Sequence, residues 1–245
     1  MLPRFHVPFP LAPGAGVELP DEAAHHAFRV LRLEDGDAIV LFDGRGGEWQ
    51  ARLHRAGRGA RAVLESYVAE DREPALRVTL VQALPAGDKM DFVVQKCTEL
   101  GVAAIQPVAA KRSVIRLSGD RLERRVQHWR QVAIAACEQC GRNQPPLVAP
   151  IVDLPQYLAR MAAENGSAQA RWLLVPAGGA RLREMPTPPA GVHALVGPEG
   201  GFEEEELKAA ALAGFGPVGL GPRVLRTETA GAAAIAAMMA LWGDF

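Results

Sequence analysis

The feature of this sequence that most constrains its fold is the alternation of strand and helix patterns from residue 75 onward. Apolar runs of strand length occupy residues 76–84, 103–108, 171–175, 192–196 and 217–220. Helical patterns separate or follow these runs, at residues 88–100, 120–140, 202–213 and 227–242. Strands that alternate with helices pair mostly in parallel, because each helix returns the chain to the starting edge of the sheet. This segment therefore predicts an α/β domain whose mostly parallel sheet is covered by helices on both faces.

The first seventy residues show a different pattern, that of a small β-rich module. Short apolar runs typical of strands occupy residues 38–42, 48–54 and 63–68. Glycine-containing turns separate the first two runs, and residues 23–31 predict a short helix with acidic residues at its start. The polar stretch 69–74 ends in proline and marks a boundary. We therefore expect two domains, at residues 1–72 and 73–245.

Composition excludes several classes of protein. Of the 245 residues, 49% are hydrophobic and 22% are charged, as in ordinary globular proteins. The three cysteines, Cys97, Cys137 and Cys140, argue against a disulfide framework and for a reducing cytoplasm. Cys137 and Cys140 have CxxC spacing but lie in a predicted helix with no second pair, so two helix residues one turn apart are favoured over a zinc site. We expect no metal, no signal peptide and no membrane span.

The charge is unevenly distributed. The formal net charge of −1 gives no indication of a nucleic-acid partner. Residues 75–145, however, contain 11 Lys and Arg against 6 Asp and Glu. A phosphate-facing patch would have this excess, and so would a solvated helix face, so charge alone leaves both interpretations open.

Two glycine-rich loops link strands to helices near the C-terminus, at 195–202 (LVGPEGGF) and 219–229 (GLGPRVLRTET). Ligands of open α/β sheets bind beyond the carboxyl ends of strands, and glycine lets the backbone approach a ligand closely. Neither loop has a phosphate-binding motif, and the glutamates after the first would repel a phosphate. A zwitterionic or cationic ligand such as S-adenosylmethionine fits better, although each loop alone is also compatible with an ordinary turn. Thr227 is expected to cap the last helix.

These loops resemble the two cofactor loops of the RsmE family, the ribosomal RNA uridine-N3 methyltransferases. The similarity extends to PRF at 3–5, HHAFRVLRL at 25–33, GDKMD at 87–91, and EQCGR at 138–142. RSV at 112–114 also matches. Two positions differ from the family pattern, Ala86 and Arg116, where a basic residue and a lysine are expected. The match covers nearly the whole chain in the same order.

The resemblance implies a fold, a reaction and partners. The fold would be a SPOUT-type parallel sheet with a C-terminal trefoil knot, preceded by a PUA-like β-barrel that binds RNA. The reaction would be methyl transfer from S-adenosylmethionine to N3 of a uridine in 16S ribosomal RNA, free or in the assembled small subunit. The family is homodimeric, and the nearly apolar helix at 230–242 is expected to be buried in the core or between subunits.

The resemblance also assigns candidate site residues. The cofactor would be held by Leu195, Val196, Gly197, Pro198, Glu199, Gly200, Gly201, Leu220, Gly221, Val224, Leu225 and Thr229. The catalytic candidates are Arg223, Arg226, Glu199 and Arg142. Arg223 and Arg226 would stabilise a uracil anion or hold the adjacent phosphate, and Arg142 would serve the active site or the RNA backbone unless it is only a charge at a helix C-terminus. Glu199 or Glu228 would receive the N3 proton, although an acid at a helix start is more often a cap. The RNA candidates are Arg4, Arg29, Arg32, Lys89, Lys96 and Arg112.

Three alternatives remain open from the sequence. A related SPOUT enzyme acting on transfer RNA or another ribosomal position would have the same loops. A non-catalytic RNA-binding assembly factor would keep the fold, although the intact loops argue against lost activity. A nucleotide-binding metabolic enzyme is disfavoured because the phosphate motifs are missing.

Overall fold

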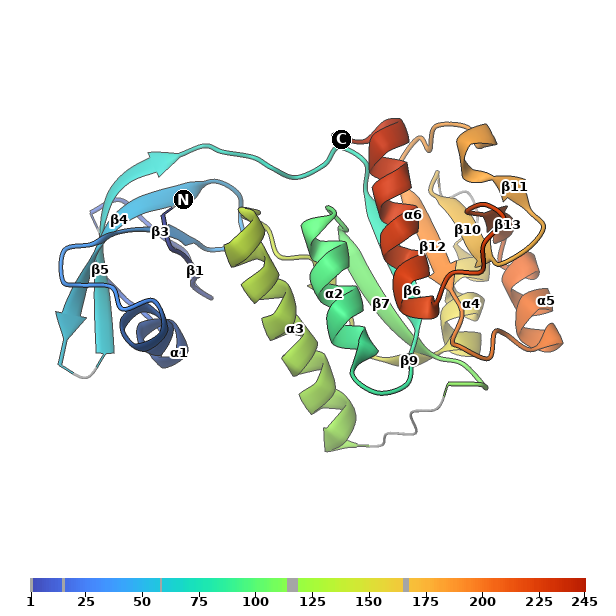
Figure 1. Cartoon of the computed structure of the whole chain (residues 1–245), viewed down its shortest axis with the longest axis horizontal. Coiled ribbons are helices and arrows are strands. Elements are labelled where there is room, and N and C mark those ends of the chain that lie inside the picture. The colour runs from blue at the N-terminus through green and yellow to red at the C-terminus, as the bar shows by residue number, and fades with distance from the viewer. Residues whose placement is uncertain (1, 15, 58, 114–118, 165–167) are drawn as a thin grey trace. The chain divides into compact units, whose positions relative to one another are not determined.

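A computed structural model describes residues 2–14, 16–57, 59–113, 119–164 and 168–245. Val114 and Arg116, which belong to the motif region discussed above, lie outside the described residues. The chain forms two compact units (Figure 1). The first unit consists of residues 1–73 and 134–145, and the second of residues 74–133 and 146–245. The return of 134–145 to the N-terminal module was not predicted, because nothing in local periodicity reports a long-range contact.

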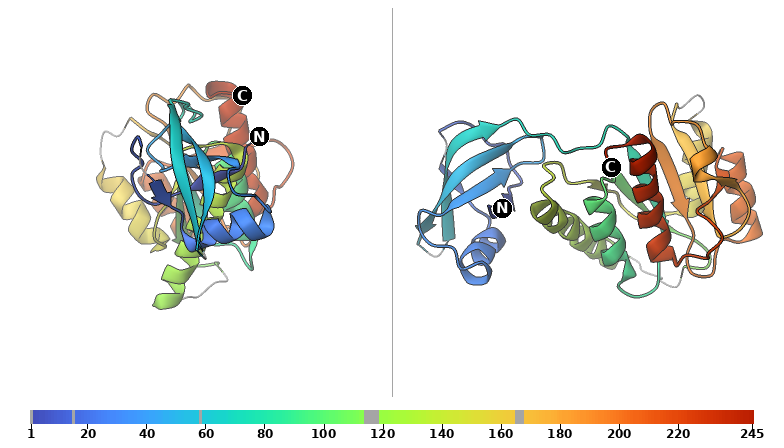
Figure 2. Two further views of the ribbon diagram at one scale, coloured as in Figure 1. Left: turned by 90° about the vertical axis from the view of Figure 1, so that its left-hand side faces the viewer. Right: turned by 45° about the horizontal axis from the view of Figure 1, so that its top comes forward.

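The first unit is built on a five-stranded sheet, seen in blue and cyan in the left view of Figure 2. Its strands are β1 (Arg4–His6), β2 (Gly16–Glu18), β3 (Ala38–Phe42), β4 (Glu48–Ala56) and β5 (Gly59–Val68). They lie in the order β1-β3-β4-β5-β2, and only the β1–β3 pair is parallel. Helix α1 (Asp21–His25) continues as a π-helical turn, His26–Val30. Phe5, Ile39 and Leu53 are among the buried side chains of this unit's core.

The second unit contains an eight-stranded sheet whose pairs are all parallel. Its strands are β6 (Val78–Ala83), β7 (Ala104–Ala109), β8 (Leu147–Val148), β9 (Val152–Asp153), β10 (Ala170–Val175), β11 (Ala180–Arg181), β12 (Val192–Val196) and β13 (Gly216–Gly219). The order across the sheet is β11-β13-β10-β12-β6-β7-β8, with β9 also paired to β7. The α/β class with a parallel sheet, predicted from the alternation, is confirmed.

Helices cover both faces of this sheet (Figures 1 and 2). They are α2 (Lys89–Glu99), α3 (Asp120–Cys140), α4 (Leu154–Ala163), α5 (Glu204–Leu212) and α6 (Thr227–Trp242), with a 3-10 turn at Leu182–Glu184. One apolar cluster joins the sheet to α2, α6 and the first part of α3, and another joins its other face to α4 and α5. Within the described ranges, no helix is both long and apolar enough to span a membrane.

Helix α4 was not predicted from the sequence. Its buried residues Leu154, Tyr157, Leu158 and Met161 have the three- and four-residue spacing of a helix face. Pro155 obscures this pattern, but proline is tolerated in the first turn because the N–H groups there need no helical partner. Helix α4 packs with α5 against the face of the sheet opposite to α6.

Candidate functional site

A cavity of about 780 Å³ lies at the carboxyl ends of β10, β12 and β13, entirely within the second unit. This volume falls within the range of roughly 300–1,000 Å³ that is usual for small-molecule sites. Its wall is made by three strand-end segments, the start of α6 and one residue of α2. The segments are 173–177, 196–202 and 223–228, with Leu220, Lys89, Leu207 and Ala230 completing the wall. The cavity therefore lies where ligands bind in parallel α/β sheets.

The strand between the two glycine-rich loops supplies a wall that the sequence analysis missed. Strand β10 lies between β12 and β13, so the two loops do not follow neighbouring strands. The end of β10 and the residues after it, Leu174 to Ala177, thus face the same space as both loops. The sequence contains a signal for this third wall. Like the other two loops, it follows an apolar strand and contains glycines, in the segment Val175-Pro176-Ala177-Gly178-Gly179.

A buried hydrogen-bond chain joins the two glycine-rich loops beneath the cavity. The Thr227 hydroxyl donates to the carbonyl oxygen of Gly197 at 2.6 Å and accepts from the Gln82 side-chain amide at 3.0 Å. Gln82 is fully buried and Thr227 nearly so. Thr227 is not the N-cap of α6, as the sequence suggested: Arg226 takes that position, because the hydroxyl is engaged by the other loop. The start of α6 is thereby fixed to the first loop.

An ion-pair cluster connects the cavity wall to the start of α2. The Lys89 ammonium donates to Glu199 at 2.7 Å and lies 3.7 Å from Oε2 of Glu228. The backbone N–H of Ala86 donates to both oxygens of Glu199, at 3.1 and 3.4 Å. Partial burial opposes ionisation of Glu199, but these donors outweigh it and hold its pKa below the ordinary value. The hydrogen bond from Lys89 to Glu199 likewise raises the pKa of Lys89.

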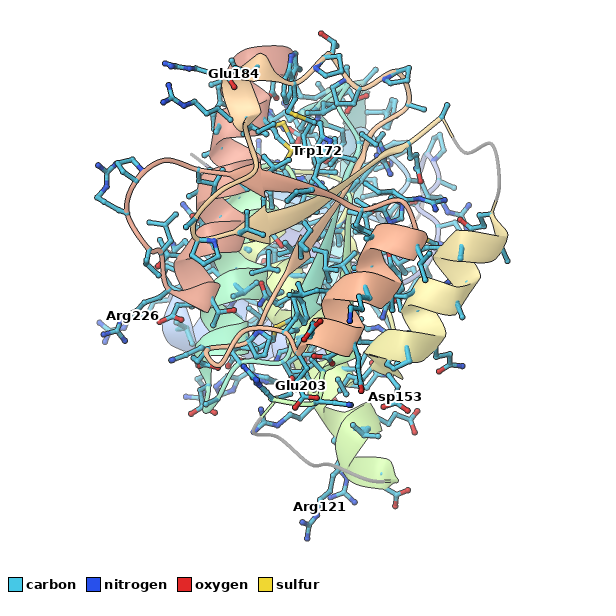
Figure 3. All side chains as sticks on the ribbon, turned by 90° about the vertical axis from the view of Figure 1, so that its right-hand side faces the viewer. Arg121, Asp153, Trp172, Glu184, Glu203 and Arg226 are labelled. Atoms are coloured by element: carbon cyan, nitrogen blue, oxygen red, sulfur yellow. The ribbon has the colours of Figure 1, made fainter. Side chains whose placement is uncertain are left out.

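The outer side of the first loop is held by basic residues that follow β7. Arg112 donates to the carbonyl oxygen of Gly200 at 2.8 Å. The backbone N–H of Lys111 donates to Glu206 at 2.8 Å, and its ammonium pairs with Glu203 and Glu205 at the start of α5. Figure 3 shows Glu203 at this end of α5. The glutamates that disfavoured a phosphate ligand thus anchor the helix that follows the loop.

The cavity suits a ligand that combines apolar parts with charged groups. Most of its wall consists of backbone and aliphatic side chains, and charged side chains of both signs lie along it: Glu199, Glu228, Lys89, Arg223 and Arg226. A β-carbon added at Gly197 would approach the Phe202 ring to 3.2 Å, and one at Gly200 would approach Arg112 to 3.3 Å. The loop therefore depends on glycine for its close packing. S-adenosylmethionine, with its sulfonium, ammonium and adenine groups, fits a wall of this kind.

Nine of the twelve predicted cofactor residues line the cavity, and three do not. Leu195 is fully buried in the apolar cluster on the α4–α5 side, because successive strand residues point to opposite faces and Val196 takes the cavity side. Gly221 and Thr229 are exposed and contribute no wall. Gly221 has a φ of +119°, so its predicted role in shaping the loop still has a backbone reason.

The predicted catalytic residues are separated by the fold. Arg223, Arg226 and Glu199 line the cavity, and Arg226 extends outward from the start of α6 in Figure 3. Arg142 belongs to the first unit, where its guanidinium forms a bidentate ion pair with Glu73. Both side chains are less than a tenth exposed. Arg142 is therefore not among the residues that line the cavity.

Arg142 is part of a buried polar cluster that holds residues 134–145 to the N-terminal module. Arg4 donates to Glu48 at 2.6 Å and also to Asn143, and Arg72 donates to Glu48 at 3.0 Å. Burial opposes ionisation of Glu48, but the two arginines outweigh it and hold its pKa below the ordinary value. Arg4, a predicted RNA contact, is buried and has its charge balanced within this cluster. Arg4 is therefore not placed to bind RNA, because a buried guanidinium cannot reach a phosphate.

The other RNA candidates are on the surface or at the cavity. Arg29 and Arg32 are exposed on the first unit, and Arg32 has a φ of +56°. Lys96 pairs with Glu99 on α2. Lys89 lines the cavity, and Arg112 supports the first loop as described. Among the described residues, no group of His, Cys, Asp or Glu could hold a metal ion.

A parallel α/β sheet with a cavity at its strand ends is typical of many enzymes, and the comparisons define this one as an RNA-modifying enzyme. Residues 72–239 match the model of the RNA methyltransferase domain, and residues 19–60 match that of the RNA methyltransferase PUA domain. The chain is 37% identical to the ribosomal RNA small subunit methyltransferase E of Synechocystis over 93% of its own length and 74% of that protein. It is 33% identical to the Bacillus subtilis protein of the same name, over 89% of the chain and 87% of the relative.

Solved structures give the same result. A ribosomal RNA small subunit methyltransferase E from Neisseria gonorrhoeae bound to S-adenosyl methionine has a TM-score of 0.91 and 41% identity, with complete coverage of both chains. A methyltransferase from Legionella pneumophila in complex with the same cofactor has a TM-score of 0.94 and 36% identity, also with complete coverage. The chain belongs to the ribosomal RNA small subunit methyltransferase E family, and it is an RNA methyltransferase. The resemblance seen in the sequence is confirmed.

Proposed function

We propose that this enzyme transfers a methyl group from S-adenosylmethionine to N3 of one uridine in 16S ribosomal RNA. The observation that carries the proposal is the cavity at the ends of β10, β12 and β13, whose size, position and glycine-dependent loops suit a folded methyl donor. Relatives that share the full length of the chain bind this donor, and the relatives' names specify RNA of the small ribosomal subunit.

The residues of the cavity would position the reactants and manage charge. S-adenosylmethionine supplies an activated methyl group, so alignment of the acceptor nitrogen with that group provides much of the rate. Backbone groups of residues 196–201 and 223–225, with Leu220, would hold the donor, and the Thr227 hydrogen bond keeps the two loops in register. Arg223 and Arg226 lie at the wall, where they would stabilise negative charge on the uracil or bind the adjacent phosphate. A paired target base would have to leave its stack, which costs a few kcal/mol.

The experiment that tests this function is nucleoside mass mapping of ribosomal RNA from cells that lack the protein. We expect one N3-methyluridine to disappear from 16S RNA and to return when the intact gene is restored. A gene carrying Thr227→Val, whose product is expected to bind the cofactor more weakly, should restore less of this nucleoside. Unchanged N3-methyluridine, or loss of a different modified nucleoside, would contradict the proposed target. Loss of a modification from transfer RNA would favour the related SPOUT activity.

We propose that exposed arginines of the first unit contact the RNA backbone. Arg29 and Arg32 are exposed, and residues 19–60 match an RNA methyltransferase PUA domain. Phosphate contacts fix position without reading sequence. Each charge reversal, Arg29→Glu or Arg32→Glu, should weaken RNA binding and lower the slope of log K against log salt by about 0.7–0.9. Arg183→Glu, on the second unit, is the matched control, and a wild-type slope in the first two variants would place them outside the interface.

We propose further that the enzyme is a homodimer. Helix α6 has a second apolar face, on which Ala233, Ala237 and Ala240 are partly or fully exposed, and Leu241 is 44% exposed. Phe92 on the adjacent helix α2 is 46% exposed. Apolar residues gathered on neighbouring helices are typical of a protein interface. Light scattering at micromolar concentration should give twice the chain mass, and Phe92→Glu should reduce it to the monomer; a wild-type monomer would contradict the dimer.

The trefoil knot, the closed barrel and the cytoplasmic location also belong to this proposal. Strand β13 comes last in the chain but lies between β10 and β11, an order that supports a knotted C-terminal region. The mostly antiparallel five-stranded sheet of the first unit, of which residues 19–60 match the PUA model, supports a barrel of that type. The three cysteines are all free thiols, as in proteins of a reducing compartment.

A further inference from the structure

We propose that Glu228 accepts the N3 proton of the acceptor uracil, and that its carboxylate selects uracil over cytosine. The inference rests on the proposed function. From the sequence, either Glu199 or Glu228 could receive the N3 proton. The geometry of the ion-pair cluster separates these two carboxylates. Glu199 accepts hydrogen bonds from protein donors on both of its oxygens. Glu228 keeps one oxygen that has no hydrogen-bond donor among the described residues.

Glu199 is poorly suited to receive a proton. Its Oε1 accepts hydrogen bonds from Lys89 at 2.7 Å and from the Ala86 N–H at 3.1 Å, and Oε2 accepts from the same N–H at 3.4 Å. These donors lower the pKa of Glu199, which makes it a weaker base. The carboxylate also links the start of α2 to the first glycine-rich loop. Its geometry is that of a structural connection between two segments of the cavity wall.

Glu228 is placed differently. Its side chain lines the cavity and is only 15% exposed, and its Oε2 is buried without a hydrogen-bond partner among the described residues. The nearest cation is the Lys89 ammonium at 3.7 Å, which donates instead to Glu199. A buried acceptor without a donor costs about 1–3 kcal/mol, so such groups in native proteins call for an explanation. A ligand that brings an N–H donor into the cavity would supply the missing partner.

The position of Glu228 in the first turn of α6 does not provide that explanation. Acidic residues there are favoured by the helix dipole, but the interaction requires no burial. In the first turn of α5, the Glu204 and Glu205 side chains are 81% and 79% exposed. Glu206, which is buried there, accepts hydrogen bonds from the backbone N–H groups of Lys111 and Glu203, whereas Glu228 Oε2 has no such donor among the described residues. The Glu228 side chain is instead shielded from water beside the cavity. Removing its carboxylate from water costs free energy, which a ligand with a hydrogen-bond donor would offset.

The acceptor base offers the matching chemistry. Uracil N3 carries a hydrogen between two carbonyl groups, so a carboxylate can accept that hydrogen while nearby cations, Lys89 and Arg226, face the carbonyl oxygens. Cytosine N3 carries a lone pair, which a carboxylate repels, and this repulsion provides specificity. As the carboxylate takes the proton, the N3 electron pair forms the bond to the methyl carbon. The electrons of the carbon–sulfur bond remain on sulfur, which becomes a neutral thioether, and the proton later passes to water.

The test is Glu228→Gln with two RNA acceptors that differ only at the target position. One carries uridine and the other carries 5-fluorouridine, whose N3 loses its proton more readily. With uridine, we expect kcat to fall by about 10²–10⁴-fold, the usual contribution of a general base. With 5-fluorouridine, the variant should recover most of this loss, whereas the wild-type rate should change little. Calorimetry should give an unchanged affinity for S-adenosylmethionine, and Glu204→Gln is the matched exposed control.

Each other outcome has a definite meaning. Equal slowing of Glu228→Gln with both acceptors indicates a structural role and overturns the inference. A large loss of S-adenosylmethionine affinity makes Glu228 a ligand of the cofactor and also overturns it. A wild-type rate in Glu228→Gln does the same. If the wild-type enzyme forms no N3-methyluridine on the uridine RNA, the proposed function itself fails, and the role of Glu228 fails with it.

Discussion

Arg142→Met should reduce the free energy of unfolding of the first unit by about 3–5 kcal/mol, the usual cost of removing one partner of a buried ion pair. Arg142 and Glu73 are both almost fully buried and form a bidentate pair, so the substitution leaves a carboxylate in the protein interior without its counter-charge. Hydrogen exchange measured by mass spectrometry on peptides covering β3 to β5 is the appropriate readout, since it reports on this unit alone. Exchange there should accelerate while the strands of the second unit keep their protection.

Two controls separate the buried pair from charge in general. Lys208→Met removes one partner of the exposed Lys208–Glu204 pair, which should contribute at most about 1 kcal/mol. The double variant Arg142→Met with Glu73→Leu replaces the pair by apolar groups and should recover most of the lost stability. Unchanged exchange in the single variant would show that the pair does not hold residues 134–145 in place. It would also reopen a direct role for Arg142 in RNA binding or catalysis.

Thr227→Val should weaken binding of S-adenosylmethionine by roughly 10- to 100-fold, corresponding to about 1–3 kcal/mol. Valine keeps the shape of threonine but removes the hydroxyl that donates to Gly197 and accepts from Gln82. The Gly197 carbonyl would then lose this donor, and the first loop would lose its connection to the start of α6. Isothermal calorimetry with purified protein measures the effect directly.

The conservative variant Thr227→Ser keeps the hydroxyl and should bind the cofactor with nearly wild-type affinity. Hydrogen exchange of α6 shows whether Thr227→Val has changed only the loop connection or the stability of the whole helix. Wild-type affinity in Thr227→Val would mean that the two loops hold their positions without this hydrogen bond. The cavity would then be shaped by the backbone and by the Lys89–Glu199–Ala86 contacts.

Much of the fold was predictable because its elements are local. The strand at Ala38–Phe42 and the helix at Thr227–Trp242 have the predicted bounds, since a strand or helix face is encoded in the spacing of apolar residues. Strands β1, β2, β8, β9 and β11 have only two or three residues, too few for any period to appear. Helix α4 was not predicted, and Pro155 in its first turn makes the helical pattern less apparent.

The candidate site was predictable where a motif is continuous in the chain. The loop at 196–201 and the segment with Arg223 and Arg226 both form the cavity wall, as their glycines and their position after strands indicated. The third wall, from Leu174 to Ala177, required the order of strands in the sheet. The sequence also could not show whether a charged side chain faces a ligand or a buried ion-pair partner, because that partner lies far away in the chain. Arg4 and Arg142 read as functional cations but balance carboxylates at Glu48 and Glu73.

The sequence by itself determined which segments form strands and helices, that two loops are built for close approach to a ligand, and to which family the chain is similar. These properties depend on neighbours within a few residues, whose spacing and backbone freedom are written in the chain. Only the tertiary structure decided that β10 separates the two loops and that Lys89 joins Glu199 but leaves Glu228 without a hydrogen-bond donor. Those facts depend on contacts between residues that lie far apart in the chain, for which local pattern carries no signal.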